Sequence, residues 1–251
     1  MIAAVTPAPP AAIGIVVRDL TLRLNNRVLF DKLNFTLDGG QCAAVLGASG
    51  VGKTSLLKII AGLTPADAGT VSGSDGLPLA GRIAYMGQKD LLYPWLTVKQ
   101  NITLGARLRR EKAESDWADY LLAEVGLDGV GASLPAALSG GMRQRAALAR
   151  TLYERQPVVL MDEPFSALDI LTRAKIQALS ARLLSAHTVM LITHDPLEAC
   201  RLSHRLWVLA GQPARFLTGL DLAGESPRAP DDPAVQQSQG ALLRQLLGSA
   251  E

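Results

Sequence analysis

The sequence predicts an α/β fold with a mainly parallel sheet, an antiparallel β portion near the N-terminus and an inserted block of helices. Three observations support this prediction. Short apolar runs alternate with helical stretches along much of the chain, which is the pattern of a parallel sheet covered by helices. Residues 13–37 instead alternate polar and apolar side chains between turn signals, as antiparallel strands do. Residues 96–150 show helical patterns and no convincing strand.

Length and composition set the scale of this fold. The chain has 251 residues, of which 48% are apolar, so it can bury the core of one large domain or of two small ones. We expect a loose Pro/Ala tail over residues 1–12, one folded domain over 13–211 with the helices inserted at about 96–150, and a short, partly helical extension over 212–251. The 25 basic and 23 acidic residues give a net charge of +2, which offers no electrostatic case for a nucleic-acid partner.

The N-terminal tail lacks the basic start and the long apolar centre of a secretory signal. No apolar run approaches the roughly 20 residues that span a bilayer. We therefore expect a cytoplasmic chain that reaches a membrane only through a partner. Cys42 and Cys200 form no metal-ligand pattern with other residues, so we expect both to be buried thiols.

The individual elements follow the apolar pattern. Two strands over 13–37 separate at Asn25 and Asn26, and the run CAAVLG then predicts a buried strand that leads into a glycine loop. The segment KTSLLKIIAGL predicts a helix that stops near Gly62 and Pro65. Further strands are expected at RIAYM, VVLMD, TVMLIT and HRLWVLA, and helices at EKAESDWADYLLAEVG and GALLRQLLGSA.

The glycine loop has the spacing of a phosphate-binding loop. GASGVGKT, from Gly47 to Thr54, fits G-x-x-x-x-G-K-[ST] between a strand and a helix. Its glycines let backbone N–H groups converge on phosphate oxygens, Lys53 reaches the β and γ phosphates, and the Thr54 hydroxyl binds Mg²⁺. A plain glycine-rich turn is the weaker alternative. The expected nucleotide-binding residues of the loop are Gly47, Ala48, Ser49, Gly50, Val51, Gly52, Lys53, Thr54 and Ser55.

Two adjacent acids end the strand expected at VVLMD. We expect Asp162 to hold Mg²⁺ through its water shell, since Mg²⁺ keeps several waters in proteins. Glu163 is then the general base that polarises the attacking water. An acid pair after a strand is otherwise most often a helix cap, but the glycine loop upstream favours the catalytic interpretation.

His194 and Gln88 also follow predicted strands, and the carboxyl ends of parallel strands meet at one edge of a sheet. We expect His194 to contact the γ-phosphate and to orient the water, although a lone histidine is more often structural. Gln88 can offer its carbonyl to Mg²⁺ or to the water. His187 and His204 lack this placement and are expected on the surface or in packing.

A serine and two glycines precede a basic, alanine-rich helical pattern in LSGGMRQRAALAR, from Leu138 to Arg150. With the motifs above, this stretch resembles the ATP-binding subunit of ABC transporters, whose signature is LSGGQ. The resemblance covers about residues 15–209, with GASGVGKT as Walker A, Gln88 as the Q-loop, VVLMDEP as Walker B and His194 as the switch histidine. The signature residues are Ser139, Gly140 and Gly141, and the D-loop residues are Ser166, Ala167, Leu168 and Asp169.

The resemblance implies a head-to-tail pair of chains that encloses two ATP molecules with Mg²⁺. Each Walker A loop then faces Ser139, Gly140 and Gly141 of the other chain, whose helix N-terminus adds free N–H groups and a partial positive charge to the γ-phosphate. The partner is a second copy of the chain or a related ATPase subunit. MgATP closes the pair, and hydrolysis releases it.

Two positions depart from the family pattern. Met142 replaces the glutamine of the signature, a change that leaves the serine and glycine contacts in place. Leu24 stands where the family usually stacks adenine on an aromatic ring. Leu24 or Val28 then packs against the base, or Phe30 does if the register differs.

The segments LLYPWLTVKQNI and EPFSALDILTRAKIQAL are similar to importer ATPases that serve nitrate, sulfonate, taurine and thiamine precursors. This similarity implies an energy-coupling subunit, peripheral on the cytoplasmic face of the inner membrane, that works with an external solute-binding protein. Transmembrane permease subunits would contact it near Gln88 to Trp95, although an apolar run is otherwise most often core. The apolar residues of that contact are Leu91, Leu92, Tyr93, Pro94 and Trp95.

Two other classes of function remain as alternatives. Soluble ABC ATPases of translation or DNA repair usually carry two cassettes in one chain or a long coiled coil between the motifs, and this sequence has neither. A nucleotide-dependent binding module without turnover is disfavoured by the presence of Glu163.

Overall fold

The computed structural model describes residues 10–24, 26–217 and 219–248. Its central sheet has the strand order β10-β8-β3-β7-β6-β5, and β9 also pairs with β8. The strands from β8 to β5 run parallel, whereas β9 and β10 are antiparallel to β8. The bounds are β3 (Cys42–Leu46), β5 (Ile83–Met86), β6 (Val158–Asp162), β7 (Thr188–Ile192), β8 (Arg205–Ala210), β9 (Arg215–Phe216) and β10 (Leu220–Asp221).

Both faces of the central sheet are covered. All residues of β6 and β7 are buried, because helices or a second sheet pack on each side. One face forms a single apolar cluster with α1 (Lys53–Ile60) and the N-terminal sheet. The other face packs against α5 (Gly140–Tyr153), α6 (Ile170–Leu183) and α7 (Pro196–Leu202). This double burial fixes the carboxyl ends of the strands, where the motif residues lie.

The N-terminal sheet is antiparallel and has the order β2-β1-β4. Its strands are β1 (Ile15–Leu24), β2 (Arg27–Leu37) and β4 (Ala68–Gly73). The apolar pattern predicts the first two but not β4, whose sequence AGTVSG holds a single branched apolar residue. Gly69, at φ +95, passes so close to β1 that a Cβ there would lie 2.5 Å from the Asp19 carbonyl oxygen. Close backbone approach, and not hydrophobicity, therefore sets the composition of β4.

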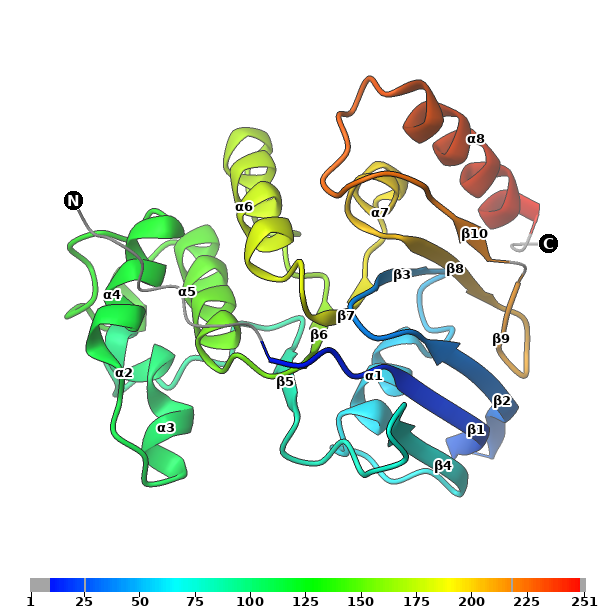
Figure 1. The fold of residues 1–251 in the computed structure, drawn as a ribbon, viewed down its shortest axis with the longest axis horizontal. Helices are drawn as coiled ribbons and strands as arrows, with labels where there is room; N and C mark the ends of the chain where they lie inside the picture. The colour runs from blue at the N-terminus through cyan, green and yellow to red at the C-terminus, as the bar shows by residue number, and fades with distance from the viewer. Residues whose placement is uncertain (1–9, 25, 218, 249–251) are drawn as a thin grey trace.

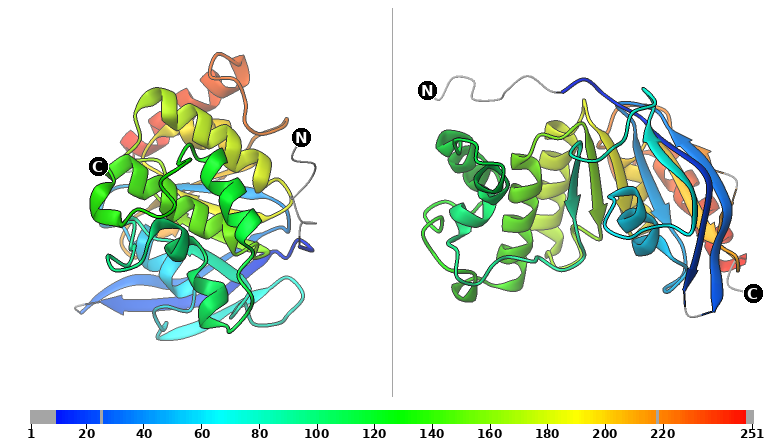
Figure 2. Two further views of the ribbon diagram at one scale, coloured as in Figure 1. Left: turned by 90° about the vertical axis from the view of Figure 1, so that its left-hand side faces the viewer. Right: turned by 90° about the horizontal axis from the view of Figure 1, so that it is seen from below.

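The residues between β5 and β6 form the helical arm at the left of Figure 1. Before α5 this arm contains α2 (Val98–Ile102), α3 (Leu104–Leu108) and α4 (Ser115–Glu124), followed by a 3₁₀ turn at Pro135–Ala137. The arm and the central sheet share one apolar cluster, and α5 lies between helices α2 to α4 and the sheet in Figure 1 and in the right-hand view of Figure 2. The predicted fold class, an α/β core with an antiparallel β portion and inserted helices, is confirmed.

The chain after β10 returns to the core through α8 (Pro233–Gly248). Its buried residues Val235 and Leu242 pack with β8 and α7 in a third apolar cluster. The helix begins seven residues before the GALLRQLLGSA segment that predicted it. Asp232 accepts a hydrogen bond from the Ala234 N–H at 2.8 Å, and Pro233 occupies the first turn. Both are helix-start signals that an apolar pattern alone misses.

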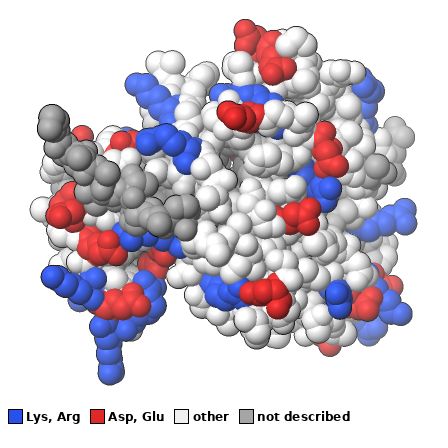
Figure 3. Space-filling model, in the orientation of Figure 1, with Lys and Arg blue, Asp and Glu red and all other residues white. Residues whose placement is uncertain are grey.

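Charge is mixed over the surface. On the face drawn in Figure 3, acidic and basic side chains of the described residues are interspersed, and the basic ones extend furthest at the α3 end of the helical arm. No helix in the described part of the chain is long and apolar enough to cross a membrane.

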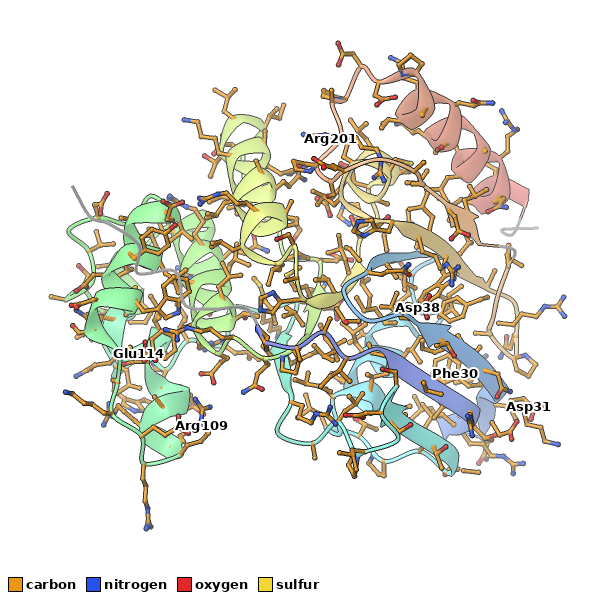
Figure 4. The ribbon with its side chains drawn as sticks, viewed as in Figure 1. Phe30, Asp31, Asp38, Arg109, Glu114 and Arg201 are labelled. Atoms are coloured by element: carbon orange, nitrogen blue, oxygen red, sulfur yellow. The ribbon has the colours of Figure 1, made fainter. Side chains whose placement is uncertain are left out.

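Arg228 fastens the C-terminal segment to the core. Arg228 is 6% exposed, and its guanidinium donates to backbone carbonyls. Arg201, labelled in Figure 4, adds a hydrogen bond from its Nε to the Arg228 carbonyl at 2.9 Å. The acceptors of the Arg228 guanidinium are the carbonyls of Leu222, Ala223, Gly224, Cys200 and Ser203, at 2.8–3.1 Å.

Replacing Arg228 with alanine should lower the free energy of unfolding by about 2 to 4 kcal/mol, because several buried carbonyls lose their donor. Arg244→Ala on the exposed side of α8 is the matched control and should change it by less than about 0.5 kcal/mol. Urea denaturation followed by circular dichroism measures both variants. Equal stability of the two variants would show that Arg228 does not hold the segment.

Candidate functional site

The glycine loop, the start of α1 and the end of β6 enclose a cleft of about 770 Å³. Residues 49–55 line it, as do Gln88, Asp162 and Glu163. Parallel strands β3, β5 and β6 all end here, which explains why residues from distant motifs meet. The sequence therefore predicted correctly that the loop, the Q-loop glutamine and the acid pair lie close together.

Two glycines of the loop are required by its neighbours. Gly47, at φ +150, approaches the end of β8 so closely that a Cβ would lie 2.2 Å from the Leu209 carbonyl oxygen. At Gly52, where φ is +111, an added Cβ would lie 3.0 Å from the side chains of Leu29 and Phe30. The loop is thus pressed against both sheets, which holds its backbone N–H groups in a fixed cradle.

The side chains of the loop are already positioned by hydrogen bonds. Lys53 Nζ donates to the carbonyls of Gly47 and Ala48 at 2.8 and 2.9 Å, so the ammonium lies over the loop. Burial lowers the pKa of Lys53, and the nearby carboxylates of Glu163 and Asp162 oppose this shift. Thr54 Oγ1 donates to Asp162 Oδ2 at 2.7 Å. A hydroxyl and a carboxylate side by side are hard oxygen donors of the kind that Mg²⁺ takes.

Burial also raises the pKa of Asp162, while the Thr54 hydrogen bond lowers it. The carboxylate is thus placed where a cation would stabilise its charged form. Among the described residues no group of three or more His, Cys, Asp or Glu side chains forms a metal cage. The donor set accordingly fits a magnesium ion whose other ligands are water and phosphate oxygens, and does not fit a metal held by protein alone.

Glu163 sits in an unusual backbone turn. Its φ is +51, a left-handed conformation that costs a residue with a Cβ about 1–2 kcal/mol. Four hydrogen bonds hold this turn. The Glu163 N–H donates to the Ile192 carbonyl at 2.9 Å, and the Glu163 carbonyl accepts from Gln144 Nε2 and Ser166 Oγ, both at 3.0 Å, and from the Ser166 N–H at 3.3 Å. The turn directs the chain away from β6 and towards α6.

Gln88 and His194 converge on one oxygen of Glu163. Gln88 Nε2 donates to Glu163 Oε2 at 3.3 Å, and His194 Nδ1 lies 3.6 Å from the same oxygen. The Glu163 side chain is 22% exposed and that of His194 68% exposed. Both neighbours approach the same carboxylate oxygen, and Glu163 lines the cleft.

The signature residues lie apart from this cleft. Ser139 is the N-cap of α5, where its Oγ accepts from the Met142 N–H at 3.3 Å. Gly140 has open space where a Cβ would stand, with its nearest neighbour 3.9 Å away. Gly141 lies near the Ala167 carbonyl of the D-loop. At the end of the D-loop Asp169 caps α6 by accepting from the Thr172 N–H at 3.0 Å.

The segment after Gln88 carries an exposed apolar surface. Leu91, Tyr93 and Trp95 are 59%, 43% and 71% exposed, and the two aromatic rings lie 5.4 Å apart. Leu92 does not belong to this surface as the sequence suggested: it is 9% exposed and packs in the core of the helical arm. We name the exposed part, Leu91 and Tyr93 to Trp95, the apolar loop surface.

Helix α5 is bonded to the residues at the start of the apolar loop surface. Arg143 Nε contacts Asp90 Oδ2 at 3.1 Å. Arg150 donates to the carbonyls of Asp90 and Leu91 at 2.7 and 2.8 Å. The helix that begins at the signature thus reaches the segment that follows Gln88.

The residues outside the predicted site behave as packing groups. His187 is buried, and His204 Nδ1 accepts from the Cys42 N–H at 2.9 Å. Cys200 is buried as expected, but Cys42 is only partly buried because it begins β3. Burial raises the pKa of the Cys42 thiol to about 12 and that of Cys200 to about 11.

Sequence reasoning missed Gln144 and Arg173. Gln144 is 6% exposed on the buried side of α5, with Ala147 and Leu148 one turn further on. A polar residue on an apolar helix face was therefore a usable signal. Arg173 Nη2 donates to the Leu168 carbonyl at 2.9 Å, and its Nη1 lies 4.0 Å from Asp195 Oδ2. Its link between the D-loop and the His194 segment depends on tertiary contacts that no local pattern encodes.

A glycine loop of this geometry before a helix, with two acids at the end of a parallel strand, defines a P-loop nucleoside triphosphatase. The model of the family described as ABC transporter matches residues 30–166. The chain is also 40% identical to the aliphatic sulfonates import ATP-binding protein SsuB of Delftia acidovorans, over 97% of this chain and 98% of that protein. The chain therefore belongs to the ABC transporter family, as one of its ATP-hydrolysing subunits.

Two further relatives and a solved structure are similar to this chain and support its place in the family. An aliphatic sulfonates import ATP-binding protein of Pseudomonas savastanoi pv. phaseolicola is 40% identical over 88% of this chain and 90% of that protein. An uncharacterized ABC transporter ATP-binding protein of Haemophilus influenzae is 40% identical over 92% and 98% of the two chains. The dimeric post-hydrolysis state of an ATP-binding cassette bound to ADP and phosphate matches with a TM-score of 0.74 and 26% identity, over 84% of this chain and 99% of that one.

Replacing Gln144 with leucine should slow phosphate release from ATP about tenfold to a hundredfold, because the Glu163 turn loses one of its hydrogen bonds. The affinity for MgATP should stay within about twofold, since Gln144 does not line the cleft. Gln237→Leu on the exposed side of α8 is the matched control. A Gln144 variant that hydrolyses ATP at the wild-type rate would contradict this role.

Proposed function

We propose that this chain is the energy-coupling subunit of an importer for small solutes of the organic sulfonate type, acting at the cytoplasmic face of a membrane. The observation that carries the proposal is the convergence of Gln88 and His194 on one carboxylate oxygen of Glu163, beside the phosphate cradle. The relatives described as aliphatic sulfonates import proteins support the solute class. An external solute-binding protein would deliver the solute.

The nucleotide is MgATP. Backbone N–H groups of residues 47–55 hold the phosphates, and the Lys53 ammonium moves from the loop carbonyls to the β and γ phosphates. Thr54 and Gln88 would hold the metal directly and Asp162 through a water. When bound, Mg²⁺ supplies positive charge that offsets the charge of the phosphates in the transition state.

Glu163 positions the attacking water. Its Oε2 is held by Gln88 and lies near His194, so the second oxygen accepts a hydrogen bond from the water and aligns it with the γ-phosphorus. His194, which is largely exposed, is available to contact the γ-phosphate. The proton that leaves the water passes to the carboxylate as the bond from phosphorus to the leaving oxygen breaks.

Each site is completed by a second chain. Ser139, Gly140 and Gly141 lie at an open helix N-terminus outside the cleft of their own chain. An incoming chain in head-to-tail arrangement would place them against the γ-phosphate, where N–H groups and the helix dipole favour negative charge. The D-loop residues Ser166 to Asp169 would lie in the same interface. The partner is a second copy or a related ATPase subunit.

The apolar loop surface is the contact with the transmembrane permease subunits. Its side chains are exposed, and α5 holds its base through Arg143 and Arg150. When the partner chain and ATP engage the N-terminus of α5, movement of that helix reaches the permease through these arginines. ATP binding thus shifts the transporter between two states only because the closed pair gains contacts that the open pair lacks.

Replacing Glu163 with glutamine should trap a dimer in MgATP, because the variant binds nucleotide and fails to hydrolyse it. Light scattering with and without MgATP measures the mass. Adding Lys53→Ala should abolish nucleotide binding and therefore the dimer. Adding Gly140→Asp should preserve binding but abolish the dimer, because a carboxylate would face the γ-phosphate. A Gly140→Asp variant that still dimerises would count against the role of the signature in the partner's site.

Trp95→Ala should weaken capture of the permease from detergent-solubilised membranes at least about tenfold, because large exposed aromatic side chains dominate such contacts. ATP hydrolysis by the isolated chain should be unchanged. Leu63→Ala is the control, since Leu63 is 61% exposed and lies outside the apolar loop surface. Equal capture by both variants would remove the proposed contact.

A further inference from the structure

The end of α3 and the turn after it carry a concentrated positive charge. Residues 107–112, with the sequence RLRREK, hold four basic side chains and one acidic one, whereas the net charge of the whole chain is only +2. All six residues are exposed. Figure 3 shows basic side chains that extend outward at this end of the helical arm. We name residues 107–112 the basic tip.

The protein supplies a counter-ion for only one of the four basic side chains. Arg109, labelled in Figure 4, lies with its Nη1 2.5 Å from Glu154 Oε2 and its Nε 2.9 Å from Glu111 Oε2. The other three form no side-chain ion pair or hydrogen bond within the part of the chain that the structure describes. These three are Arg107, Arg110 and Lys112. Like charges this close repel one another, so a partner that supplies negative charge would stabilise the tip.

Helix α5 places the basic tip next to the apolar loop surface. Arg150 donates to the Leu91 carbonyl at 2.8 Å, and Glu154, four residues further on, holds Arg109. Side chains four residues apart lie on the same face of a helix. Helix α3 is close to this face, because an added Cβ at Gly105 would lie 1.9 Å from Glu154 Oε1. The basic tip and the proposed permease contact therefore lie on one side of the helical arm.

An exposed leucine lies among the free cations. Leu108 is 74% exposed, and the chain turns at Arg110, where φ is +62. An apolar side chain between cations suits the boundary of a bilayer, because the cations meet lipid phosphates while the apolar group enters the acyl region. The tip has no aromatic side chain of the kind that anchors protein contacts. Three free cations are also too few to neutralise the many phosphates of a nucleic acid.

We propose that the basic tip binds the anionic phospholipid headgroups of the membrane that holds the permease. The inference rests on the proposed function, because the permease contact determines which side of the chain faces the membrane. Lipid contact gives the subunit a second attachment beside the permease, which raises its effective concentration there. Each cation near an anionic bilayer strengthens binding about fivefold, and salt weakens the contact.

Co-sedimentation of the full chain with lipid vesicles tests this contact. Vesicles of phosphatidylcholine with an equal amount of phosphatidylglycerol should bind the chain at least about tenfold more tightly than phosphatidylcholine alone. Salt at about 0.5 M should remove the difference. The tip variant replaces Arg107, Arg110 and Lys112 with glutamine, and its affinity for the anionic vesicles should fall at least about tenfold. Its ATP hydrolysis should be unchanged, because these residues lie outside the nucleotide cleft.

The matched control removes the same charge from the N-terminal sheet. It replaces Arg18, Arg23 and Lys32, which are exposed on β1 and β2, with glutamine. Its affinity for anionic vesicles should stay within about twofold of the wild type. An equal loss in the control and the tip variant would overturn the inference, because net charge alone would then explain binding. A wild-type chain without preference for anionic vesicles would overturn it as well.

Capture of the permease in neutral detergent separates lipid from protein as the partner of the tip. The tip variant should capture the permease as the wild type does. Capture that falls with the tip variant as it does with Trp95→Ala would assign the tip to the permease and overturn the lipid contact. Failure of the wild-type chain to capture any permease would instead overturn the proposed function, so the two failures are distinct.

Discussion

The left-handed turn at Glu163 is the constraint on which the site depends. Strand β6 ends at Asp162, and an extended continuation would carry the next side chain to the other face of the sheet. The positive φ of Glu163 instead brings both acids to one cleft. The hydrogen bonds that the Glu163 carbonyl accepts from Gln144 and Ser166, and the one that the Glu163 N–H donates to the Ile192 carbonyl, make this conformation the stable one. The carboxylate is therefore positioned by three elements, β7, α5 and the D-loop, and a shift in any of them displaces it.

Helix α5 joins the parts that a transporter ATPase must coordinate. Its first residues form the exposed N-terminus of the signature, Gln144 holds the Glu163 turn and accepts from the Ala167 N–H at 2.7 Å, and Arg143 and Arg150 hold the apolar loop surface. Closely packed helices move as rigid bodies, because a packed core does not deform continuously. In the proposed assembly, a partner chain that binds at one end of α5 would therefore act on Glu163 and on the apolar loop surface together.

The sequence predicted those features whose physical requirement is local. A phosphate cradle needs glycines at set intervals, so GASGVGKT can be recognised from its spacing alone. Buried parallel strands can likewise be recognised as short apolar runs. Because the carboxyl ends of parallel strands meet at one edge of a sheet, the sequence also predicted correctly that Gln88, Asp162 and Glu163 lie close together. Features that depend on contact between distant segments were missed. Arg173 reaches the Leu168 carbonyl and Asp195 only in the folded chain, and β4 is a strand because β1 lies beside it. The burial of Phe30 and Leu92 likewise required the structure.

The C-terminal segment is continuous with the site through a chain of polar contacts. Arg201 donates from Nε to the Arg228 carbonyl and from Nη1 to Gln177 Oε1, at 2.9 and 3.0 Å. Gln177 Nε2 donates in turn to the buried carboxyl of Glu198 at 2.9 Å. Glu198 lies on α7, directly after the segment that bears His194. Burial raises the pKa of Glu198, whereas hydrogen bonds from Thr193 and Gln177 lower it.

A carboxyl group buried in this way is tolerated only while its donors stay in place, because an unsatisfied buried charge is strongly destabilising. The donors stay in place because Arg201 orients Gln177, and Arg201 is itself held by the backbone at Arg228. The segment after β10 therefore supports α7, the helix that follows His194, and is packed against the domain instead of being an independent appendage. A chain that ended after β8 would keep every motif of the family and still lack the groups that hold α7, and with it the histidine, in position.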